Sequence, residues 1–267
     1  MKLSISQNEN ISLGMREDHI IIASHRRSGT QLTIDLILNN FDIYSNAKPY
    51  LSLAGLQKNI HKKEFENQFI SNLKDKPRVI KSHAHANHSD YYSNNETILH
   101  IANYLFKNCK IIYVYRDGRD VLNSLYYYYN KLYPERNAIN FSQFINMKND
   151  LDDDTFSKNL NRVEYWYYHL NGWLQKNNIL FLSYEQILKD YYGCFLKIRE
   201  YLAINPNSKI IDVRISQHST QSNNKAKHTS ILYRKGLIGD YQNIFSREDY
   251  NVFEKYTNNL LNKLGYN

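Results

Sequence analysis

Short apolar runs alternate with longer segments of helical periodicity along this chain of 267 residues. Four runs have the length and composition of buried strands, and each is followed by a segment whose apolar residues recur every three or four positions. These strands are predicted at His19–Ala23, Arg78–Ser82, Lys110–Tyr115 and Ile179–Ser183. Strands that alternate with helices favour an α/β fold in which a central parallel sheet is flanked by helices on both faces.

The same periodicity predicts six helices, and the last of them begins with Ser246-Arg-Glu-Asp249, the pattern of a capping box. The predicted helices are Thr30–Asn40, Glu96–Lys107, Asp120–Lys131, Thr155–Gln175, Glu185–Leu202 and Glu248–Leu264. No Pro/Gly/Ser-rich linker, internal repeat or low-complexity tract divides the sequence. We therefore expect a single domain over residues 1–267.

The net charge of the chain indicates an anionic partner. Hydrophobic residues make up 42%, which suits a globular protein, and the net charge of +8 favours an anion, leaving nucleic acid, acidic membrane and nucleotide open. The two cysteines, Cys109 and Cys194, give neither zinc spacing nor a disulfide framework and fit a reducing compartment. No stretch resembles a signal peptide or a membrane span, so the expected localisation is cytoplasmic.

A glycine-containing loop, Ser24-His-Arg-Arg-Ser-Gly-Thr30, follows the first predicted strand and opens a helix. Gly29 lets the backbone approach a ligand closely, and the helix start offers free N–H groups and a positive dipole end. We expect Arg27, Ser28, Gly29 and Thr30 to enclose one phosphate-sized anion. The alternative is a plain turn capped by Ser28 or Thr30. The Walker pattern G-x-x-x-x-G-K-[ST] is absent, which disfavours an ordinary P-loop NTPase.

The second predicted strand ends in Lys81-Ser-His83. Residues two apart in an extended chain project to the same side, so Lys81 and His83 can combine a stabilising cation with a general base. The alternative is a metal cluster of His83, His85 and His88, but the spacing is irregular and no carboxylate accompanies it. We therefore expect no metal.

The third strand end and a late basic segment provide further cations. Arg116 leaves the strand while Ser124 lies in the early helix, and together they can hold a second phosphate. Alternatively, Asp117 and Asp120 only favour a helix start. Residues 233–241 place two cations before two glycines, the composition either of a loop that closes over an anion or of a surface turn.

Taken in order, these segments resemble the sulfotransferases that use 3′-phosphoadenosine 5′-phosphosulfate (PAPS). Arg26-Arg-Ser-Gly-Thr30 is similar to the family's 5′-phosphosulfate loop, and Lys81-Ser-His83 to the strand end that carries its base. Three more segments agree: Tyr113–Ser124 with the 3′-phosphate motif, Trp166-x-x-His169-x-x-x-Trp173 followed by Tyr184-Glu185, and Arg234-Lys-Gly-Leu-Ile-Gly-Asp240 with the RKGxxGD loop.

The resemblance implies a fold of the P-loop nucleotide-binding type and transfer of a sulfuryl group from PAPS to a hydroxyl or amine of a small molecule or glycan. His83 would be the base, with Lys81 and Arg27 stabilising the departing 5′-phosphate and no metal needed. The implied donor-binding residues are Arg27, Ser28, Gly29, Thr30, Gln31, Arg116, Ser124, Tyr184, Arg234, Lys235 and Gly236.

Several positions depart from the family pattern. Arg26 replaces a proline, Leu32 stands where one branch has a tryptophan, and the dimerisation motif expected near residues 242–251 is not matched, so the oligomeric state stays open. Two other classes remain: a small-molecule kinase, for which the loop lacks its lysine, and a non-catalytic module that binds an anion or glycan. No nucleic-acid motif is present, so we expect no nucleic-acid partner.

Overall fold

A parallel sheet of five strands organises the residues that the computed structural model describes, which are 14–45, 49–134, 139–151, 156–214 and 236–266. The strand order is β2-β3-β1-β4-β5. The chain runs from central β1 to β2 and β3 on one side, and then crosses to β4 and β5 on the other, which creates a switch point where ligands of such sheets bind. The strands are β1 Ile20–Ser24, β2 Leu51–Ser52, β3 Val79–Ser82, β4 Lys110–Tyr115 and β5 Ile179–Ser183.

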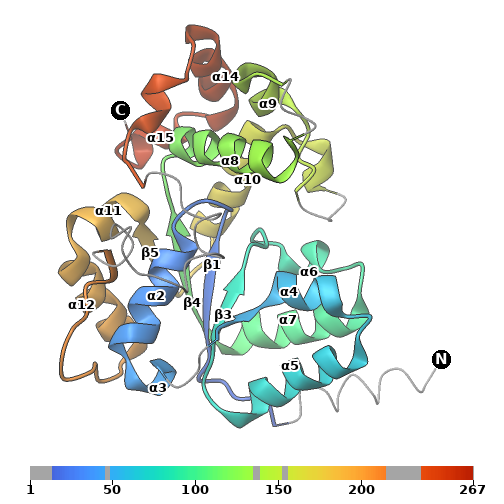
Figure 1. Ribbon diagram of the computed structural model, residues 1–267, viewed down its shortest axis with the longest axis vertical. Helices are drawn as coiled ribbons and strands as arrows, with labels where there is room; N and C mark the ends of the chain where they lie inside the picture. The colour runs from blue at the N-terminus through green and yellow to red at the C-terminus, as the bar shows by residue number, and fades with distance from the viewer. Residues whose placement is uncertain (1–13, 46–48, 135–138, 152–155, 215–235, 267) are drawn as a thin grey trace.

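Alternate side chains of β1, β3, β4 and β5 enter two separate hydrophobic clusters. The clusters lie on opposite faces of the sheet, and helices cover both faces (Figure 1). In β1, Ile20 and Ile22 face one cluster, whereas Ile21 and Ala23 face the other, as the twofold repeat of a strand requires. The first cluster is covered by α2 Thr30–Asn40, α3 Asp42–Ser45, α11 Tyr184–Lys189 and α12 Tyr191–Leu202. Over the second lie α4 Leu53–Asn59, α5 Lys63–Asp75, α6 His88–Tyr91 and α7 Glu96–Asn108.

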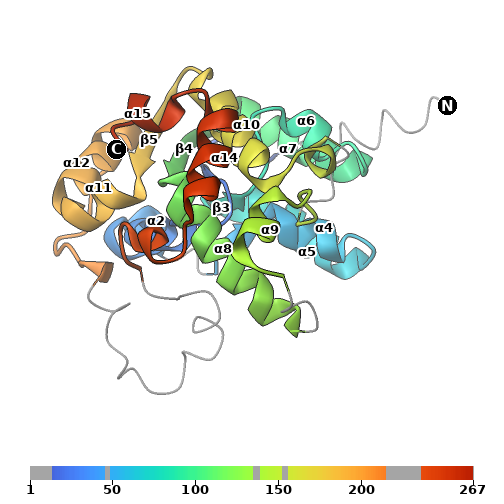
Figure 2. The ribbon, with the colours of Figure 1, turned by 90° about the horizontal axis from the view of Figure 1, so that it is seen from above.

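A third group of helices lies over the carboxyl ends of the strands, as the view from above shows (Figure 2). In this group α10 packs against α8, α9 and α14. The group comprises α8 Gly118–Leu132, α9 Phe141–Asn146, α10 Arg162–Leu174, α14 Arg247–Thr257 and α15 Leu260–Lys263, with short 3₁₀ turns at Ser157–Asn159 and Asp240–Asn243.

The structure confirms the predicted fold class and all four predicted strands, each to within one residue at either end. The sequence analysis missed β2, which has only two residues and lies at the edge of the sheet. A strand this short carries no periodicity, so pattern reasoning has nothing to detect. Within the described residues, no helix is long and apolar enough to cross a bilayer.

Three of the predicted helices were wrong in extent, and a local capping group explains each difference. The helix predicted at Thr155–Gln175 begins at Arg162, because Asn161 and Glu164 form a capping box there. The helix predicted at Glu185–Leu202 is two helices, since Asp190 ends α11 and caps α12 through the Gly193 N–H. The last predicted helix, Glu248–Leu264, is interrupted where Asn258 and Asn259 take positive φ.

Gly118 is predicted to be required by the packing of α8 against α10. An added Cβ would lie 2.5 Å from Cε2 of Trp166, whose ring is buried in the core and has no room to move. Gly118→Ala should therefore lower the free energy of unfolding in urea by about 1–3 kcal/mol, despite the better helix propensity of alanine.

Gly172→Ala in α10 is the matched control, since its Cβ would lie 3.3 Å from that of Ala86. Its stability should stay within about 1 kcal/mol of wild type because the gain in helix propensity offsets this milder crowding. Equal losses for both variants would contradict the assignment.

Candidate active site

The loop between β1 and α2 is a tight, anchored turn. Arg27 has φ of 69° and Gly29 has φ of 100°, so positive φ occurs on both sides of Ser28. Reversals of this kind turn backbone N–H groups toward a common point, where an anion binds. The hydroxyls of Ser24 and Thr30 lie 2.6 Å apart and join the end of the strand to the start of the helix.

The Arg27 side chain joins this loop to the third strand end. Its Nε donates a hydrogen bond of 3.1 Å to the hydroxyl of Ser124 in α8. The guanidinium also lies over the Tyr128 ring, 5.0 Å from its centroid. Two motifs that are 97 residues apart in the sequence therefore meet at one point.

Arg116 and Tyr184, both predicted site residues, are stacked on each other. The Arg116 guanidinium lies 4.5 Å from the centroid of the Tyr184 ring. Arg116 donates a 2.8 Å hydrogen bond to the Leu237 carbonyl, and the Tyr184 hydroxyl donates one of 3.1 Å to that of Gly236. Two consecutive carbonyls of the late loop thus bond this pair of side chains. Arg234 and Lys235, predicted in the same loop, lie outside the described residues.

Gly29 brings the first loop against the same pair. A Cβ at this position would lie 2.6 Å from Cδ2 of Tyr184, so only glycine allows the ring to approach the loop this closely. The Tyr184 ring therefore packs against both Arg116 and the backbone of Gly29. Gln31, by contrast, bonds Asp35 one turn along α2 at 2.9 Å.

Two buried polar atoms, one in the turn after β1 and one on Arg116, make no hydrogen bond to any described residue. They are the hydroxyl oxygen of Ser28, a residue only 1% exposed, and Nε of Arg116. Buried polar groups normally have partners, and a donor without one marks a place for a ligand. Both atoms can donate to the oxygens of a phosphate or sulfate group, so the residues present fit an anionic ligand.

The geometry of His83 fixes which of its ring nitrogens can act as a base. Nδ1 lies 2.9 Å from the backbone carbonyl of Ser24, and a carbonyl can only accept, so Nδ1 carries the proton. In the neutral ring, Nε2 then holds the lone pair. His83 is buried beside the loop, which is a suitable position for a general base.

Lys81 lies next to the same loop, in a strongly cationic environment. Burial and the nearby Arg26 and Arg27 lower the pKa of Lys81 from 10.5 to about 8. Its ammonium lies 5.9 Å from the centroid of the Tyr50 ring. The structure thus brings Lys81, His83 and Arg27 to one edge of the sheet.

The remaining histidines of the second strand end diverge from His83. The ring of His85 packs among Tyr91 and Tyr168, whereas that of His88 stacks on Phe106 with centroids 4.3 Å apart. Across the described ranges, no group of three or more His, Cys, Asp or Glu side chains is arranged to hold a metal ion.

Sequence reasoning missed two buried carboxylates that hold the site together. Asp120 accepts hydrogen bonds from the N–H groups of Gly239 (2.8 Å) and Tyr241 (3.0 Å), which fixes the late loop to α8. It also lies 3.4 Å from Arg116 as an ion pair. Asp117 behaves as the simpler interpretation predicted, because it caps α8 through the Arg119 N–H.

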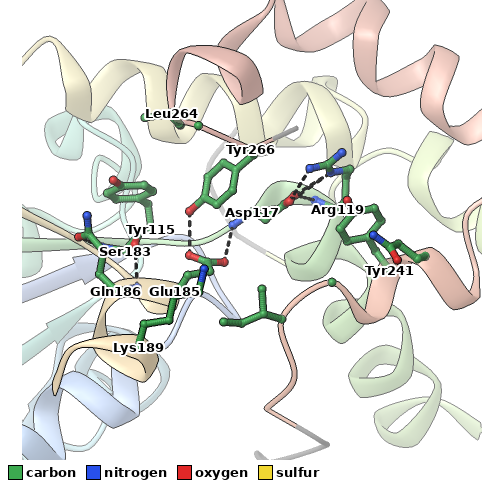
Figure 3. Close-up of a pocket in the computed structure, with 14 residues that line it drawn as sticks. Tyr115, Asp117, Arg119, Ser183, Glu185, Gln186, Lys189, Tyr241, Leu264 and Tyr266 are labelled. Atoms are coloured by element: carbon green, nitrogen blue, oxygen red, sulfur yellow. Dashed lines mark hydrogen bonds and ion pairs between the residues drawn. The ribbon is translucent and has the colours of Figure 1, made fainter.

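The second carboxylate is Glu185, which lines a cavity of about 470 Å³ between the ends of β4 and β5 and the C-terminal segment (Figure 3). It accepts hydrogen bonds from the Asp117 N–H (3.1 Å) and the Tyr266 hydroxyl (2.8 Å), and burial raises its pKa. The sequence feature that could have identified Glu185 is the Tyr184-Glu185 pair at the end of β5. Tyr184 faces Arg116, while the adjacent Glu185 lines this cavity instead.

Comparison with known proteins identifies the family to which this chain belongs. A sequence model of the sulfotransferase domain matches residues 17–265, so the chain belongs to the sulfotransferase domain family. Sulfotransferase 1E1 of Rattus norvegicus is 27% identical over 271 residues, covering 90% of this chain and 82% of the relative. The amine sulfotransferase of Oryctolagus cuniculus is 26% identical over 266 residues, covering 90% and 80%.

Two solved structures share the fold. Mouse sulfotransferase SULT7A1 complexed with PAP has a TM-score of 0.63 and 21% identity, covering 94% of this chain and 86% of that one. Retinol dehydratase in a complex with retinol and PAP has a TM-score of 0.59 and 20% identity, covering 96% and 85%. The family and fold class expected from the sequence are confirmed.

Gly29→Ala is predicted to lower the free energy of unfolding by about 2–4 kcal/mol. Roughly 1–2 kcal/mol comes from placing a side chain on a left-handed backbone, and the rest from overlap with the Tyr184 ring. In a Tyr184→Ala background only the backbone contribution should remain, as measured by urea unfolding of all four members of the cycle. The same loss in both backgrounds would show that the ring does not restrict this position.

Proposed function

We propose that this protein transfers a sulfuryl group from PAPS to a hydroxyl or amine of a small molecule or glycan. The observation that carries the proposal is the convergence of three strand ends on one edge, with Arg27 bonded to Ser124 and Arg116 stacked on Tyr184. The fold neighbours solved with PAP, adenosine 3′,5′-bisphosphate, support the donor, because PAP is what PAPS becomes after transfer.

The two anionic groups of the donor match two cationic positions. The 5′-phosphosulfate would lie in the turn formed by Arg27, Ser28, Gly29 and Thr30, where the buried Ser28 hydroxyl is available to it. The 3′-phosphate would lie near Arg116 and Ser124, with Tyr184 beside the adenine. Arg234, Lys235 and Gly236 would complete this side. The 3′-phosphate takes no part in the chemistry, but its binding energy orients the reacting group.

His83 would act as the general base. Its Nε2 accepts the proton of the acceptor hydroxyl or amine as that group attacks sulfur. A new S–O or S–N bond forms while the bond from sulfur to the bridging oxygen breaks, and that oxygen leaves with the 5′-phosphate. General base assistance typically contributes about 10²–10⁴-fold.

Charge stabilisation would come from groups that are already in place. The bridging oxygen gains negative charge, which Arg27, Lys81 and the N–H groups at the start of α2 would stabilise. These groups are fixed by the fold before the reaction, so little reorganisation is needed when the charge develops.

Residues 41–76 and 130–161 would contribute to the acceptor pocket, and one residue of each lies next to this centre. Tyr50 packs over Lys81, and the Leu151 carbonyl accepts a 3.0 Å hydrogen bond from Arg26. Acceptors of the size of retinol and androsterone, named for fold neighbours, are one class to test; amines are another, because an amine sulfotransferase is among the relatives.

The proposal is tested by incubating the protein with labelled PAPS and a panel of phenols, alcohols, amines and oligosaccharides. We expect label transfer to at least one class, and a rise in melting temperature with PAP but not with ATP–Mg²⁺. Stabilisation by ATP–Mg²⁺ alone would support a kinase instead, and salt-sensitive binding of glycans without transfer would support a binding module.

His83→Ala is expected to lower kcat for the transferring acceptor by about 10²–10⁴-fold while PAP affinity changes little, because the base touches the acceptor and not the nucleotide. Steady-state kinetics and calorimetric titration with PAP measure the two quantities. Unchanged kcat would remove His83 from the reaction.

The pH dependence of kcat/KM for PAPS is expected to follow Lys81. Below pH 8 its ammonium is charged and can bind the anion; as pH rises through about 8 the charge is lost, so kcat/KM should fall. The fall should approach about tenfold per pH unit if the charge is required. Lys81→Arg should move this limb above pH 10, since arginine stays protonated.

Lys63→Arg is the control: Lys63 is exposed and pairs with Glu66, and its replacement should leave the profile unchanged. A falling limb in the same place for wild type and Lys81→Arg would assign it to another group.

A further inference from the structure

The Trp166-x-x-His169-x-x-x-Trp173 pattern of α10 takes no part in the proposed chemistry, yet two of its residues bond the backbone of the base. His169 Nε2 lies 3.1 Å from the carbonyl of His83 itself. The indole Nε1 of Trp173 donates a 3.1 Å hydrogen bond to the carbonyl of the next residue, Ala84. Two consecutive carbonyls at the end of β3 are therefore held by one helix.

The hydrogen bonds of His169 fix its tautomer. The His83 carbonyl can only accept, so Nε2 of His169 carries the proton and Nδ1 of the neutral ring accepts. The hydroxyl of Tyr113 lies 2.8 Å from that Nδ1 and donates to it. Burial raises the pKa of Tyr113 well above its ordinary value, so this hydroxyl keeps its proton.

The chain of contacts continues into the anion-binding turn. The ring of His25, the first residue after β1, lies edge-on to that of His169, with centroids 5.4 Å apart. Register places Tyr113 beside Ala23 of β1, and its ring stacks on that of Trp173 with centroids 5.4 Å apart. His25, Tyr113, His169 and His83 thus form one buried series from the turn to the base.

We propose that Tyr113, His169 and Trp173 are positioning residues that set the placement of His83 relative to the anion-binding turn. This inference rests on the proposed function, since it assigns them a role in that reaction. Each is at most 2% exposed, so a lost partner is not replaced by bulk water. A displacement of about 1 Å in a reacting group can cost on the order of 10²-fold in rate.

The chain offers a matched control at the opposite edge of the sheet. His19 is 1% exposed and, like His169, donates through Nε2 to a backbone carbonyl, that of Leu73, at 2.9 Å. Its Nδ1 accepts from the Arg78 backbone N–H at 3.0 Å, where Nδ1 of His169 accepts from a side-chain hydroxyl. It lies just before β1, at the amino ends of the strands. Both buried histidines therefore donate one hydrogen bond to a backbone carbonyl and accept another, but of the two only His169 bonds the base.

The experiment compares His169→Phe with His19→Phe in kcat, in KM for PAPS and in PAP affinity, each per folded molecule. We expect His169→Phe to lower kcat by about 10–100-fold with less than about threefold change in PAP affinity. His169→Gln, which keeps a donor and an acceptor, should recover part of the loss. His19→Phe should keep kcat within about twofold of wild type, whatever it does to stability.

Coupling along the series provides a second readout. If Tyr113 acts through His169, then Tyr113→Phe should lower kcat in the wild-type background but add nothing to His169→Phe. Tyr44→Phe, which loses a buried hydrogen bond to the Asp18 carbonyl, is the control and should leave kcat unchanged. Equal effects of the His169 and His19 variants, or fully additive effects of Tyr113 and His169, would overturn the proposal.

A third readout does not depend on activity. Amide hydrogen exchange in peptides covering residues 82–88 should speed up at least about tenfold in His169→Phe and stay unchanged in His19→Phe. Unchanged exchange in both would overturn the positioning role. If wild type transfers no label from PAPS to any acceptor, the proposed function fails, whereas this exchange result still decides whether α10 holds the base.

Discussion

The structure depends on keeping three cations, Arg27, Lys81 and Arg116, close together at the carboxyl edge of the sheet. Each cation lies against a tyrosine ring: Arg27 on Tyr128, Lys81 on Tyr50 and Arg116 on Tyr184. The face of an aromatic ring attracts a cation through its quadrupole but carries no net charge. The rings therefore stabilise the three cations without cancelling their charge, and Arg116 is also paired with the Asp120 carboxylate at 3.4 Å. The lowered pKa of Lys81 is the sign of the repulsion and desolvation that this arrangement imposes.

The sequence was sufficient to predict four of the five strands, because buried strands between helices leave a pattern that does not depend on distant contacts. It was insufficient where a single polar side chain decides whether a helix continues. Nothing in the surrounding sequence distinguishes Asp190 from a residue inside a helix. Its carboxylate nevertheless accepts a hydrogen bond from the Gly193 N–H and caps the start of a new helix. Asn258 and Asn259 interrupt the last helix in the same local way, by adopting positive φ.

In the candidate site, too, residues marked by a local pattern were predictable, whereas those that depend on distant contacts were not. Residues that follow a strand directly, such as Arg27, His83 and Arg116, were predictable because the carboxyl ends of parallel strands share one edge. Asp120 and the bond from His169 to His83 were not, because their partners lie 119 and 86 residues away in the sequence. Nothing in a local pattern shows which carbonyl or N–H a buried side chain will reach.

The turn between β1 and α2 shows why the fold needs these distant contacts. Arg27 at positive φ is a conformation that a side-chain-bearing residue rarely adopts, and it persists only where its surroundings impose it. Three segments do so: Ser124 accepts from Arg27, the Leu151 carbonyl accepts from Arg26, and the His169 ring of α10 packs against that of His25. Because each anchor comes from a different segment, the turn reaches its strained shape only when the whole edge is assembled. Local sequence can nominate this turn for an anion, whereas the rest of the chain must hold it in place.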